Sequence, residues 1–461
     1  MRFFFLHKSL CSFFFEYKIK VCTALILFMF IASCKRDIDD ECPKCPRVTS
    51  VTPNATHFND TVLISGKHLL PNPNYNDVLQ VKFNGYLIPD EYIIENYDDS
   101  IRLIIPKGTQ SGPVTVDINV ADELVSAGSA NFTYLYKYTV STLAGSGTQG
   151  SLDSPDLLSA QFEEMHQMVI NPVNNDLIII DYLYVPSTFR VRQVSLIDGV
   201  TTLYSSPDIR NGLACDASGQ IYIATRDNGT SCRIKKLVYA TNWSASPYAG
   251  TGTCGYIDGS LTVAQFEIVR DMFVDANNNL FLGEMARLRK ITSAGIVSTV
   301  TGGTTTGYMD GPAASALFLN VASLDFDGNG NIYIADNSDQ RIRMLSASGV
   351  VSTIAGTGTQ GYSNGPALTS ELTFPGGITT DNAGNLYFVD GSRHNIRKLD
   401  LNASQVSIFA GTSNGSVAGY ANGDLSVARF NLPYKLAFNK NLNILYVLDR
   451  GNFMIRQIMF E

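Results

Sequence analysis

The segment NIYIADNSDQRIRML (331–345) decides the fold, because both of its halves recur six times along the chain. The first half is an apolar strand that ends in an acid in five of the six copies. These copies are DLIIID (176–181), QIYIAT (220–225), NLFLGE (279–284), NIYIAD (331–336), NLYFVD (385–390) and ILYVLD (444–449). The second half is a basic strand, found as FRVRQV (189–194), CRIKKL (232–237), RLRKI (287–291), RIRML (341–345), NIRKL (395–399) and MIRQI (454–458). Repetition at this spacing predicts a ring or array of similar β-units.

Each repeat contains four strand-like pieces. An apolar strand such as RDMFVDA (270–276) precedes the repeated pair, and an outer strand such as VVSTIAG (350–356) follows it. Four short strands in each unit are typical of a propeller blade, so six repeats predict six blades. The sixth repeat lacks its outer strand, while TVSTLAG (139–145) stands unused before the first. We expect this N-terminal strand to complete the last blade, which closes the ring and removes an exposed edge.

The pattern NLYFVD followed by NIRKL resembles the NHL repeat family, and the resemblance covers residues 136–461. It implies an all-β, six-bladed NHL β-propeller. The second repeat departs from the pattern, because Thr225 replaces the acid. Some NHL propellers are enzymes that use histidines near the axis. Here His166 and His394 occupy different blade positions, and no metal-spaced or Ser-His-acid pattern is visible, so we expect no catalytic residue, no metal and no cofactor.

Repeated charged and aromatic residues inside the blades are interpreted as structural. The acid that ends the second strand recurs beside a repeated arginine of the third strand, which predicts charge-assisted pairs that tie neighbouring strands. An Ala-x-Phe motif precedes several inner strands, for example Ala316 and Phe318. We expect these phenylalanines to pack between blades.

Five strand-like pieces precede the repeats: TVLISG (61–66), LQVKFNG (79–85), SIRLIIP (100–106), GPVTVDINV (112–120) and ANFTYLY (130–136). Their spacing is typical of an antiparallel sandwich. The fourth piece alternates, which predicts that its apolar residues face the core and its polar residues, Asp117 among them, face outward. With the opening PRVTSVTP (46–53) and the closing NFTY, the set resembles the TIG (IPT) family of immunoglobulin-like domains. The resemblance implies a small sandwich over residues 46–135 that acts as a spacer or binding module.

The N-terminal stretch is typical of an export signal. Lys18 and Lys20 precede the apolar run VCTALILFMFIAS (21–33), which is too short to span a bilayer comfortably. The run ends in IASC, which resembles a bacterial lipobox and implies cleavage before Cys34 and lipidation of this residue. Residues 1–33 are then a lipoprotein signal peptide and residues 34–45 a tether. An ordinary signal peptide with an incidental cysteine is the alternative.

The acid-rich KRDIDDE (35–41) resembles the surface-export signal of Bacteroidota lipoproteins. It implies a lipid-anchored protein of the outer membrane that faces the exterior. Retention in the periplasm and a plain solvated tether are the alternatives. Export also makes disulfides possible. Cys232 begins a basic strand and Cys254 lies in the segment that follows, so the two are a candidate disulfide whose formation depends on their separation in space.

Longer crossing segments join each outer strand to the next inner strand, and they carry a repeat of their own. Four of them contain a Tyr two residues before an acid or amide, as in Tyr256/Asp258, Tyr308/Asp310, Tyr362/Asn364 and Tyr420/Asn422. Because the segments cross one face of the disc, we expect them to surround its mouth. A Tyr ring beside a carboxylate or amide suits a sugar, so these eight residues are candidate ligand contacts. Alternatively, each Tyr packs its own loop and the Asp or Asn closes a turn.

Charge narrows the choice of partner. The net charge is −8 and the basic residues form no stripe, which argues against nucleic acid and against adsorption of the folded part on anionic lipid. We therefore expect a cell-surface lipoprotein, held at the membrane by its lipid alone, that binds extracellular glycan as an accessory to polysaccharide uptake. Its partner is a glycan or an envelope protein such as a glycan importer. The alternatives are an envelope protein–protein interaction scaffold and a polysaccharide lyase or hydrolase.

Overall fold

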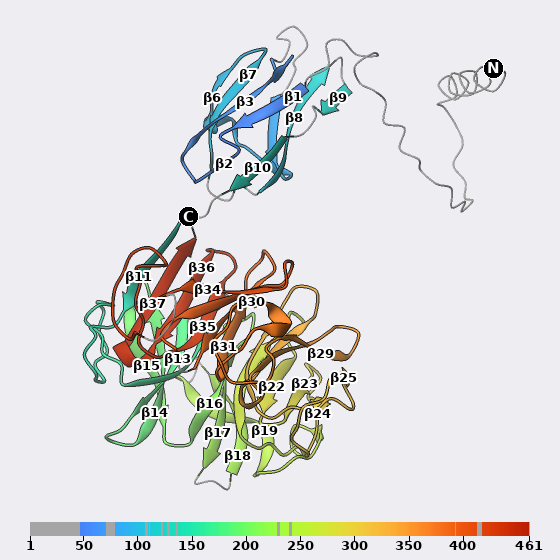
Figure 1. The fold of residues 1–461 in the computed structure, drawn as a ribbon. Coiled ribbons are helices and arrows are strands. Elements are labelled where there is room, and N and C mark those ends of the chain that lie inside the picture. Colours follow the sequence, from blue (N-terminus) through green and yellow to red (C-terminus); the bar gives the residue numbers. More distant parts are fainter. Residues whose placement is uncertain are drawn as a thin grey trace, which may run out of the picture. The chain divides into compact units, whose positions relative to one another are not determined.

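The computed structural model describes residues 47–70, 79–106, 109, 111–120, 123–126, 130–134, 137–227, 231–238, 242–391, 393–412 and 417–460. The predicted signal peptide, the tether and Cys34 lie outside these ranges. The described residues form β-strands and short 3₁₀ helices, so the fold is all-β (Figure 1). The chain divides into two compact units, which meet in the sequence near residue 134.

The first unit is a sandwich of two antiparallel sheets. One sheet has the order β1 (Arg47–Thr52), β3 (Thr61–Lys67), β7 (Ser100–Ile104) and β6 (Ile93–Asn96). The other has the order β2 (Ala55–Thr56), β10 (Ala130–Tyr134), β8 (Gly112–Val120), β4 (Leu79–Phe83) and β5 (Tyr86–Leu87), with β9 (Glu123–Ser126) paired to β8. A 3₁₀ helix, η1 (Asp90–Tyr92), lies between β5 and β6. Phe83 and Phe132 pack edge to face in the core, with 4.8 Å between their ring centroids.

Asp117 lies on the face of β8 opposite Val116 and Ile118, as the alternation predicts, and it is nevertheless buried there. Its neighbours Val116 and Ile118 are buried as the alternation predicts, but Asp117 itself is only 5% exposed. The ammonium group of Lys82, on the adjacent strand β4, lies 2.7 Å from the Asp117 carboxylate. A buried carboxylate is tolerated when a cation and hydrogen bonds accompany it. The partner lies far away in the sequence, so alternation within one strand does not reveal it.

The second unit is a six-bladed β-propeller. From the inner to the outer strand, blade one contains β12 (Glu164–Ile170), β13 (Leu177–Leu183), β14 (Thr188–Ser195) and β15 (Gly199–Ser206). Blade two contains β16 (Ile209–Cys215), β17 (Ile221–Asp227), β18 (Ser231–Val238) and β19 (Ser244–Thr253). Blade three contains β21 (Val269–Val274), β22 (Leu280–Glu284), β23 (Arg287–Ile291) and β24 (Ile296–Gly302).

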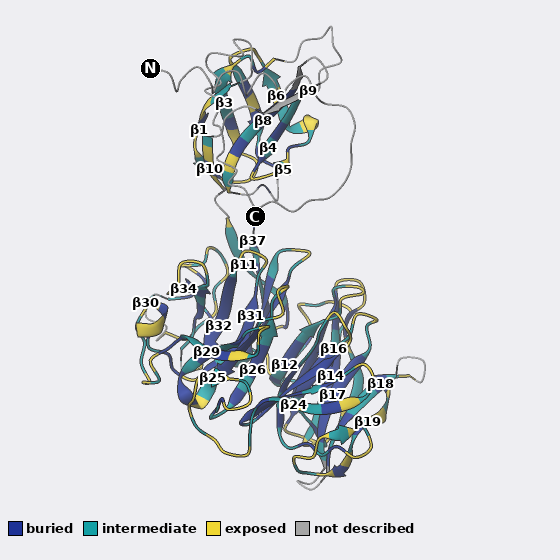
Figure 2. Cartoon of the chain, turned by 90° about the vertical axis from the view of Figure 1, so that its right-hand side faces the viewer, coloured by how far each residue is buried: buried dark blue, intermediate teal, exposed yellow. Residues whose placement is uncertain are grey.

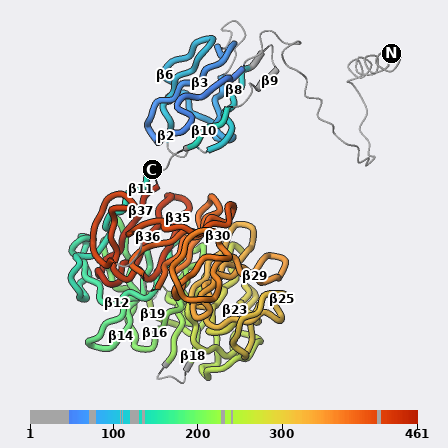
Figure 3. The backbone as a smooth tube through the Cα atoms, viewed as in Figure 1, coloured from blue at the N-terminus to red at the C-terminus, as the bar shows by residue number. Residues whose placement is uncertain are grey.

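The remaining blades follow in chain order, as the colour sequence of Figure 3 shows. Blade four contains β26 (Val321–Phe326), β27 (Ile332–Asp336), β28 (Arg341–Leu345) and β29 (Val350–Ala355). Blade five contains β31 (Pro375–Thr380), β32 (Asn385–Asp390), β33 (Ile396–Asp400) and β34 (Gln405–Ala410). Blade six contains β35 (Pro433–Asn439), β36 (Ile444–Asp449), β37 (Met454–Phe460) and β11 (Tyr138–Ala144). The short elements are β20 (Gly259–Ser260), β25 (Gly311–Pro312), β30 (Gly365–Pro366), η3 (Asn337–Asp339), η4 (Ala367–Thr369) and η5 (Arg450–Asn452).

Strand β11 closes the ring, as predicted. It pairs antiparallel with β37, from Tyr138 opposite Phe460 to Ala144 opposite Ile455. The two strands lie side by side in Figure 1, although they come from opposite ends of the propeller sequence. The last blade is therefore completed by the first strand, and its outer edge is not left unpaired.

Apolar clusters between neighbouring blades hold the ring together, and the buried strands appear dark blue in Figure 2. The cluster between the first and last blades joins Met168 and Ile179 to Leu448 and Ile455. The phenylalanines of the Ala-x-Phe motifs are fully buried, which confirms their predicted packing role; they are Phe162, Phe266, Phe318 and Phe430. Because each blade packs against both neighbours, the ring fixes the positions of all six inner strands around the axis.

Candidate functional site

Five blades each enclose one fully buried arginine: Arg192, Arg289, Arg343, Arg397 and Arg456. In blade six, Arg456 lies 2.9 Å from the carboxylate of Asp449 and donates a 2.7 Å hydrogen bond to Oδ1 of Asn422. It also donates to the backbone carbonyls of Ala421 and Arg429. The other four have the same kinds of partner: the acid of the second strand, an Asp or Asn of the crossing segment, and two carbonyls. The predicted acid–arginine pairs are confirmed.

Burial and hydrogen bonding act in opposite directions on the pKa values of the acids in these networks. Burial raises the pKa of Asp449 to about 6 and that of Glu284 to about 7, although Arg456 and Arg289 oppose the shift. Burial also acts on the more exposed Asp258, but hydrogen bonds from the Thr299 backbone N–H and from Arg289 outweigh it, so the pKa of Asp258 is lowered. The arginine therefore lets a charged carboxylate occupy the blade interior.

The four tyrosines of the crossing segments lie against arginines of their own blades. The Arg287 guanidinium lies 3.2 Å from the ring centroid of Tyr256, and that of Arg341 lies 3.8 Å from the centroid of Tyr308. Tyr362 contacts Arg393 and Arg397, and Tyr420 contacts Arg456, at 4.6 to 4.9 Å. Their hydroxyl groups bond Glu267, Thr353, Asn395 and Thr142 respectively. Cation–π contacts and hydrogen bonds thus hold each ring on its own blade.

The predicted Tyr–Asp and Tyr–Asn pairs lie beside the outer strands, and the structure does not bring them together at the axis. Asp310 accepts a 3.0 Å hydrogen bond from the backbone of Thr353 in β29, and Asp258 accepts one from Thr299 in β24. Asn364 and Asn422 accept from the buried Arg397 and Arg456. Tyr256, Tyr308 and Tyr420 remain 41 to 50% exposed. Contact of these eight residues with a ligand stays a prediction.

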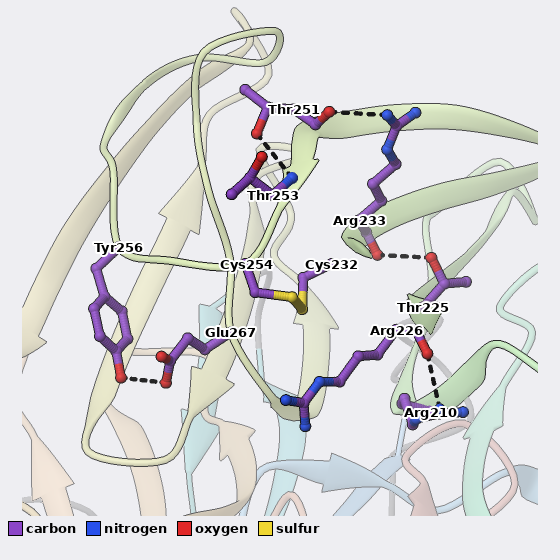
Figure 4. The surroundings of a disulfide bond; sticks show 10 residues. All are labelled: Arg210, Thr225, Arg226, Cys232, Arg233, Thr251, Thr253, Cys254, Tyr256 and Glu267. Atoms are coloured by element: carbon purple, nitrogen blue, oxygen red, sulfur yellow. Dashed lines mark hydrogen bonds between the residues drawn. A yellow bond between two sulfur atoms is a disulfide. The ribbon is translucent and has the colours of Figure 1, made fainter. Parts of the chain in front are cut away.

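Blade two replaces this network by other contacts. Thr225 stands where the acid is found elsewhere, and Lys235 stands in the position of the buried arginine and pairs with Asp208 at 2.6 Å. Cys232 and Cys254 form a disulfide that ties β18 to the next crossing segment (Figure 4). The same view shows the Tyr256 hydroxyl directed at Glu267.

The inner strands present a different residue to the axis in each blade. Near the start of these strands, blades one to six carry His166, Asn211, Arg270, Ala322, Gly376 and Tyr434, and all six line one cavity. In β12, β21 and β26 the residue at this position has no partner in the register with the second strand, so it forms a β-bulge. These residues are His166, Arg270 and Ala322. A bulge changes the direction of a side chain and is common beside binding sites. The ring geometry thus gathers six unlike residues at one point.

This axial cavity has a volume of about 240 Å³. Its floor is a buried polar network in which the ammonium group of Lys435 lies 2.5 Å from the carboxylate of Asp271. Gln167 and Ser323 donate hydrogen bonds of 2.8 and 2.9 Å to the same carboxylate. These four residues lie one position deeper along the inner strands of blades one, three, four and six. Their polar groups bind one another, so a ligand would meet the residues above them.

Three buried polar atoms of the cavity have no hydrogen-bond partner among the described residues. They are Nε of Arg270, Nδ1 of His166 and Oδ1 of Asn320. Arg450 differs, because it pairs with Glu164 at 3.2 Å and covers the ring of Tyr434 at 4.4 Å. Buried polar groups in proteins are nearly always satisfied. Three residues that line this one cavity thus carry polar atoms for which the described residues provide no partner.

His166 sits among aromatic rings and is neutral at neutral pH. Its ring centroid lies 5.7 Å from that of Phe189 and 6.1 Å from that of Tyr434. Burial lowers the pKa of His166, against the opposing attraction of Glu164. Its Nε2 lies 3.6 Å from Oε1 of Glu164, and the negative charge of this carboxylate favours the tautomer with the proton on Nε2. In this tautomer Nδ1 is an acceptor, and it has no hydrogen-bond partner among the described residues.

Exposed apolar side chains form part of the rim. Phe374 and Leu432 are each 41% exposed and both have φ near +49°, a left-handed conformation that is strained for bulky residues. Their backbone N–H groups are held by Gln340 and by Nδ1 of His394, at 2.6 and 3.0 Å. Tyr434 adds a third exposed side chain and a second ring. The rim therefore combines apolar surface with the polar groups below it.

A second cavity, of about 400 Å³, lies at the opposite end of the axis and is more apolar. Phe273 and Phe326 stack there with 4.7 Å between centroids. Lys435 borders both cavities, so the floor network separates them. Within the described ranges, no cluster of His, Cys, Asp or Glu is suited to hold a metal ion. The same residues include no helix long and apolar enough to cross a membrane.

Reasoning from the sequence missed the axial cavity. His166 was noted only because its blade position differs from that of His394, and Arg270 and Asn320 were not selected at all. One position near the start of the inner strand carries a different residue in every blade, and this variation could have pointed to the cavity.

Comparison with known proteins agrees with this architecture. Residues 46–136 match the family model of the IPT/TIG domain. Protein SUPPRESSOR OF QUENCHING 1 of Arabidopsis thaliana is 38% identical over 98 residues, which is 21% of this chain and 9% of that protein. NHL repeat-containing protein 2 of Bos taurus is 27% identical over 139 residues, 28% of this chain and 19% of that protein. The chain spans less than a tenth of the length of the first curated relatives that it matches.

Solved structures resemble the chain over both units. One, with a TM-score of 0.62 and 20% identity, is a structural genomics protein of unknown function from Bacteroides thetaiotaomicron; it covers 91% of this chain and 99% of its own. An auxiliary nutrient binding protein from Bacteroides ovatus has a TM-score of 0.56 and 18% identity over 91% and 99% of the two chains. At this identity the likeness shows the fold alone. The chain is thus an all-β protein that combines a TIG domain with a β-propeller similar to those of NHL-repeat proteins.

Proposed function

We propose that this chain is a binding protein that holds a saccharide in the axial cavity of its propeller. The observation that carries the proposal is the convergence of three unpaired polar atoms, on Arg270, His166 and Asn320, on one cavity. Exposed rings of Tyr434 and Phe374 stand at the same mouth. Saccharides offer hydroxyl groups to the former and apolar C–H faces to the latter, which is the combination that such a site requires.

The proposed place of action is the cell surface. The support for it is the sequence IASCKRDIDDE, in which Cys34 would carry the lipid and the acids would direct export. The similar Bacteroides proteins that bind nutrients as auxiliaries share both units over nearly their full length, which supports an accessory role in glycan uptake. A glycan importer in the same membrane is the corresponding protein partner.

The residues that line the cavity are better suited to binding a saccharide than to cleaving one. No Asp or Glu lines the cavity, so it lacks the pair of carboxylates that glycoside hydrolysis uses. His166 is the one imidazole among its lining residues, and its nearest acid is a carboxylate that already pairs with Arg450. A nucleophile activated by a neighbouring base is not present among these residues.

Affinity electrophoresis of the full chain through gels that contain single polysaccharides tests the proposal. We expect at least one neutral or acidic polysaccharide to retard the wild-type protein, and we expect the double variant Asn320→Ala/Tyr434→Ala to lose the retardation. The matched control is Tyr308→Ala/Tyr362→Ala, which removes the rings at the blade edges. Equal migration of the wild type in every gel contradicts saccharide binding. If only the control variant loses the retardation, the saccharide binds at the blade edges and not in the axial cavity.

A protein-interaction scaffold is the second candidate, and the opposite mouth favours it. Its larger, apolar cavity presents the stacked pair Phe273 and Phe326, and apolar aromatic surface is typical of protein contacts. Crosslinking in intact cells, followed by purification under denaturing conditions, tests this role. A partner whose capture is lost in Phe326→Ser but kept in Asn320→Ala/Tyr434→Ala would support the scaffold.

A further inference from the structure

We infer that the axial cavity selects acidic saccharides and that Arg270 receives their carboxylate. This inference rests on the proposed function, because it names the class of ligand for the same site. It follows from the balance of charge, from the geometry of the unpaired atoms and from the acceptors that stand beside them.

The residues that line the cavity carry positive charge and no negative charge. Three cationic side chains line it, on Arg270, Lys435 and Arg450, and no carboxylate does. Lys435 is neutralised by Asp271 in the floor and Arg450 by Glu164 beside the rim. Arg270 has no ion pair among the described residues, in a protein whose net charge is −8. One positive charge thus remains for a ligand, where the rest of the surface repels anions.

The unpaired edge of Arg270 suits a carboxylate. No hydrogen bond or ion pair joins its guanidinium group to a described residue, and because Nε itself is buried, the two terminal nitrogens are the ones that can meet a ligand. The guanidinium fork presents parallel N–H groups that match the two oxygens of a carboxylate, and such bidentate pairs are strong and directional. The five repeated arginines show the contrast, because the terminal nitrogens of each already donate to an acid or to carbonyls.

The neighbouring acceptors require hydroxyl donors in the same ligand. Oδ1 of Asn320 and Nδ1 of His166 have no hydrogen-bond partner among the described residues, and Nδ1 is an acceptor in the tautomer that Glu164 favours. Inorganic sulfate has no proton to donate and leaves both atoms unsatisfied. A uronic acid carries a carboxylate and several hydroxyl groups on one ring, so it can satisfy Arg270, Asn320 and His166 together.

Calorimetric titration of the full chain with matched trisaccharides tests the inference. The acidic probes are the trimers of galacturonate, glucuronate and mannuronate, and the neutral probes are the same trimers after reduction of each carboxyl to a hydroxymethyl group. We expect at least one acidic trimer to bind at least about tenfold more tightly than its reduced form, because the charged pair is lost on reduction. Sodium sulfate alone should bind weakly and compete poorly.

The variant Arg270→Met separates recognition from a structural role. It keeps the length of the side chain and removes the charge, so the preference for the acidic trimer should fall to about onefold. Its melting temperature should stay equal to that of the wild type, because no ion pair or hydrogen bond of the guanidinium group to a described residue is lost. A structural arginine would instead lower the melting temperature. Arg102→Met, at an exposed position of the sandwich, is the matched control and should change neither quantity.

The outcomes for the two proposals differ. If the reduced trimers bind as tightly as the acidic ones, or if Arg270→Met keeps the preference, the carboxylate inference is overturned while saccharide binding stands. If neither the acidic nor the reduced trimers bind, and no polysaccharide retards the protein, both fail.

Discussion

The propeller contains two kinds of arginine, and their surroundings differ completely. Arg456 and its four counterparts lie inside the blades, where each meets an acid, an Asp or Asn and two backbone carbonyls. Arg270 lies at the axial mouth and meets none of these among the described residues. The first kind repeats in the sequence and the second does not. The repeated polar residues of this propeller are thus used by the fold, whereas the residues that break the repeat at the axis are left for a ligand.

The largest expected effect comes from breaking a repeated pair. We expect Asp449→Ala to lower the free energy of unfolding by about 3 to 5 kcal/mol, because Arg456 then stays buried without its carboxylate. Urea denaturation followed by circular dichroism measures this change. Arg270→Met in the same assay should show no loss. A loss below about 1 kcal/mol for Asp449→Ala would contradict the structural assignment of the repeated pairs.

Blade two differs from the other blades, because it lacks the acid and the buried arginine and contains a disulfide instead. The contribution of this disulfide to stability is the next largest effect that we expect. We expect the double variant Cys232→Ala/Cys254→Ala to lose about 3 kcal/mol, since the bond joins residues separated by 22 positions and restricts the unfolded chain. Denaturation of the oxidised protein and of the variant gives the difference. Cys215→Ala, at the half-buried free thiol of the same blade, is the control and should lose clearly less. Equal losses would mean that the bond contributes little.

A smaller effect is expected at the blade edge. Asp310 pairs with the buried Arg343 but is 35% exposed, so water screens part of the interaction. We expect Asp310→Ala to lose about 1 kcal/mol of stability and to leave saccharide affinity unchanged. Denaturation and calorimetry on the same preparation check both statements. A weakened affinity with unchanged stability would place Asp310 in the binding site.

The smallest effect is expected for the exposed tyrosines. Tyr308 covers Arg341, and such a cation–π contact contributes about 0.5 to 1 kcal/mol at an exposed site. Tyr308→Ala should therefore lower the stability by about that amount, with no change in the affinity for a saccharide. A tenfold loss of affinity in this variant would show that the residues predicted from the sequence do contact the ligand.

The architecture was readable from the sequence because it depends on short, repeated patterns. NIYIAD and RIRML place an acid and an arginine at fixed positions in a blade, so their pairing follows from the strand register. The closure by residues 139–145 followed from one missing strand and one spare strand. The burial of Asp117 on the outward face was not readable, because its partner, Lys82, belongs to another strand and no local pattern links the two.

The axial cavity was not readable in the same way. Arg270 and His166 each look like an ordinary polar residue at the start of a strand, and only closure of the ring brings them together. The β-bulges at these residues also depend on pairing with the next strand. The tyrosines attracted attention because they repeat, yet repetition in a propeller reflects what every blade needs for packing. A position that varies among the six blades is the more useful guide to a binding site.

A crystal structure of the full chain soaked with the tightest-binding uronate trimer would locate the ligand. We expect ligand density in the axial cavity, with the carboxylate against Arg270 and a hydroxyl group on Asn320. Density stacked on Tyr308 or Tyr362 at the blade edges, with the axial cavity empty of sugar, would contradict this expectation.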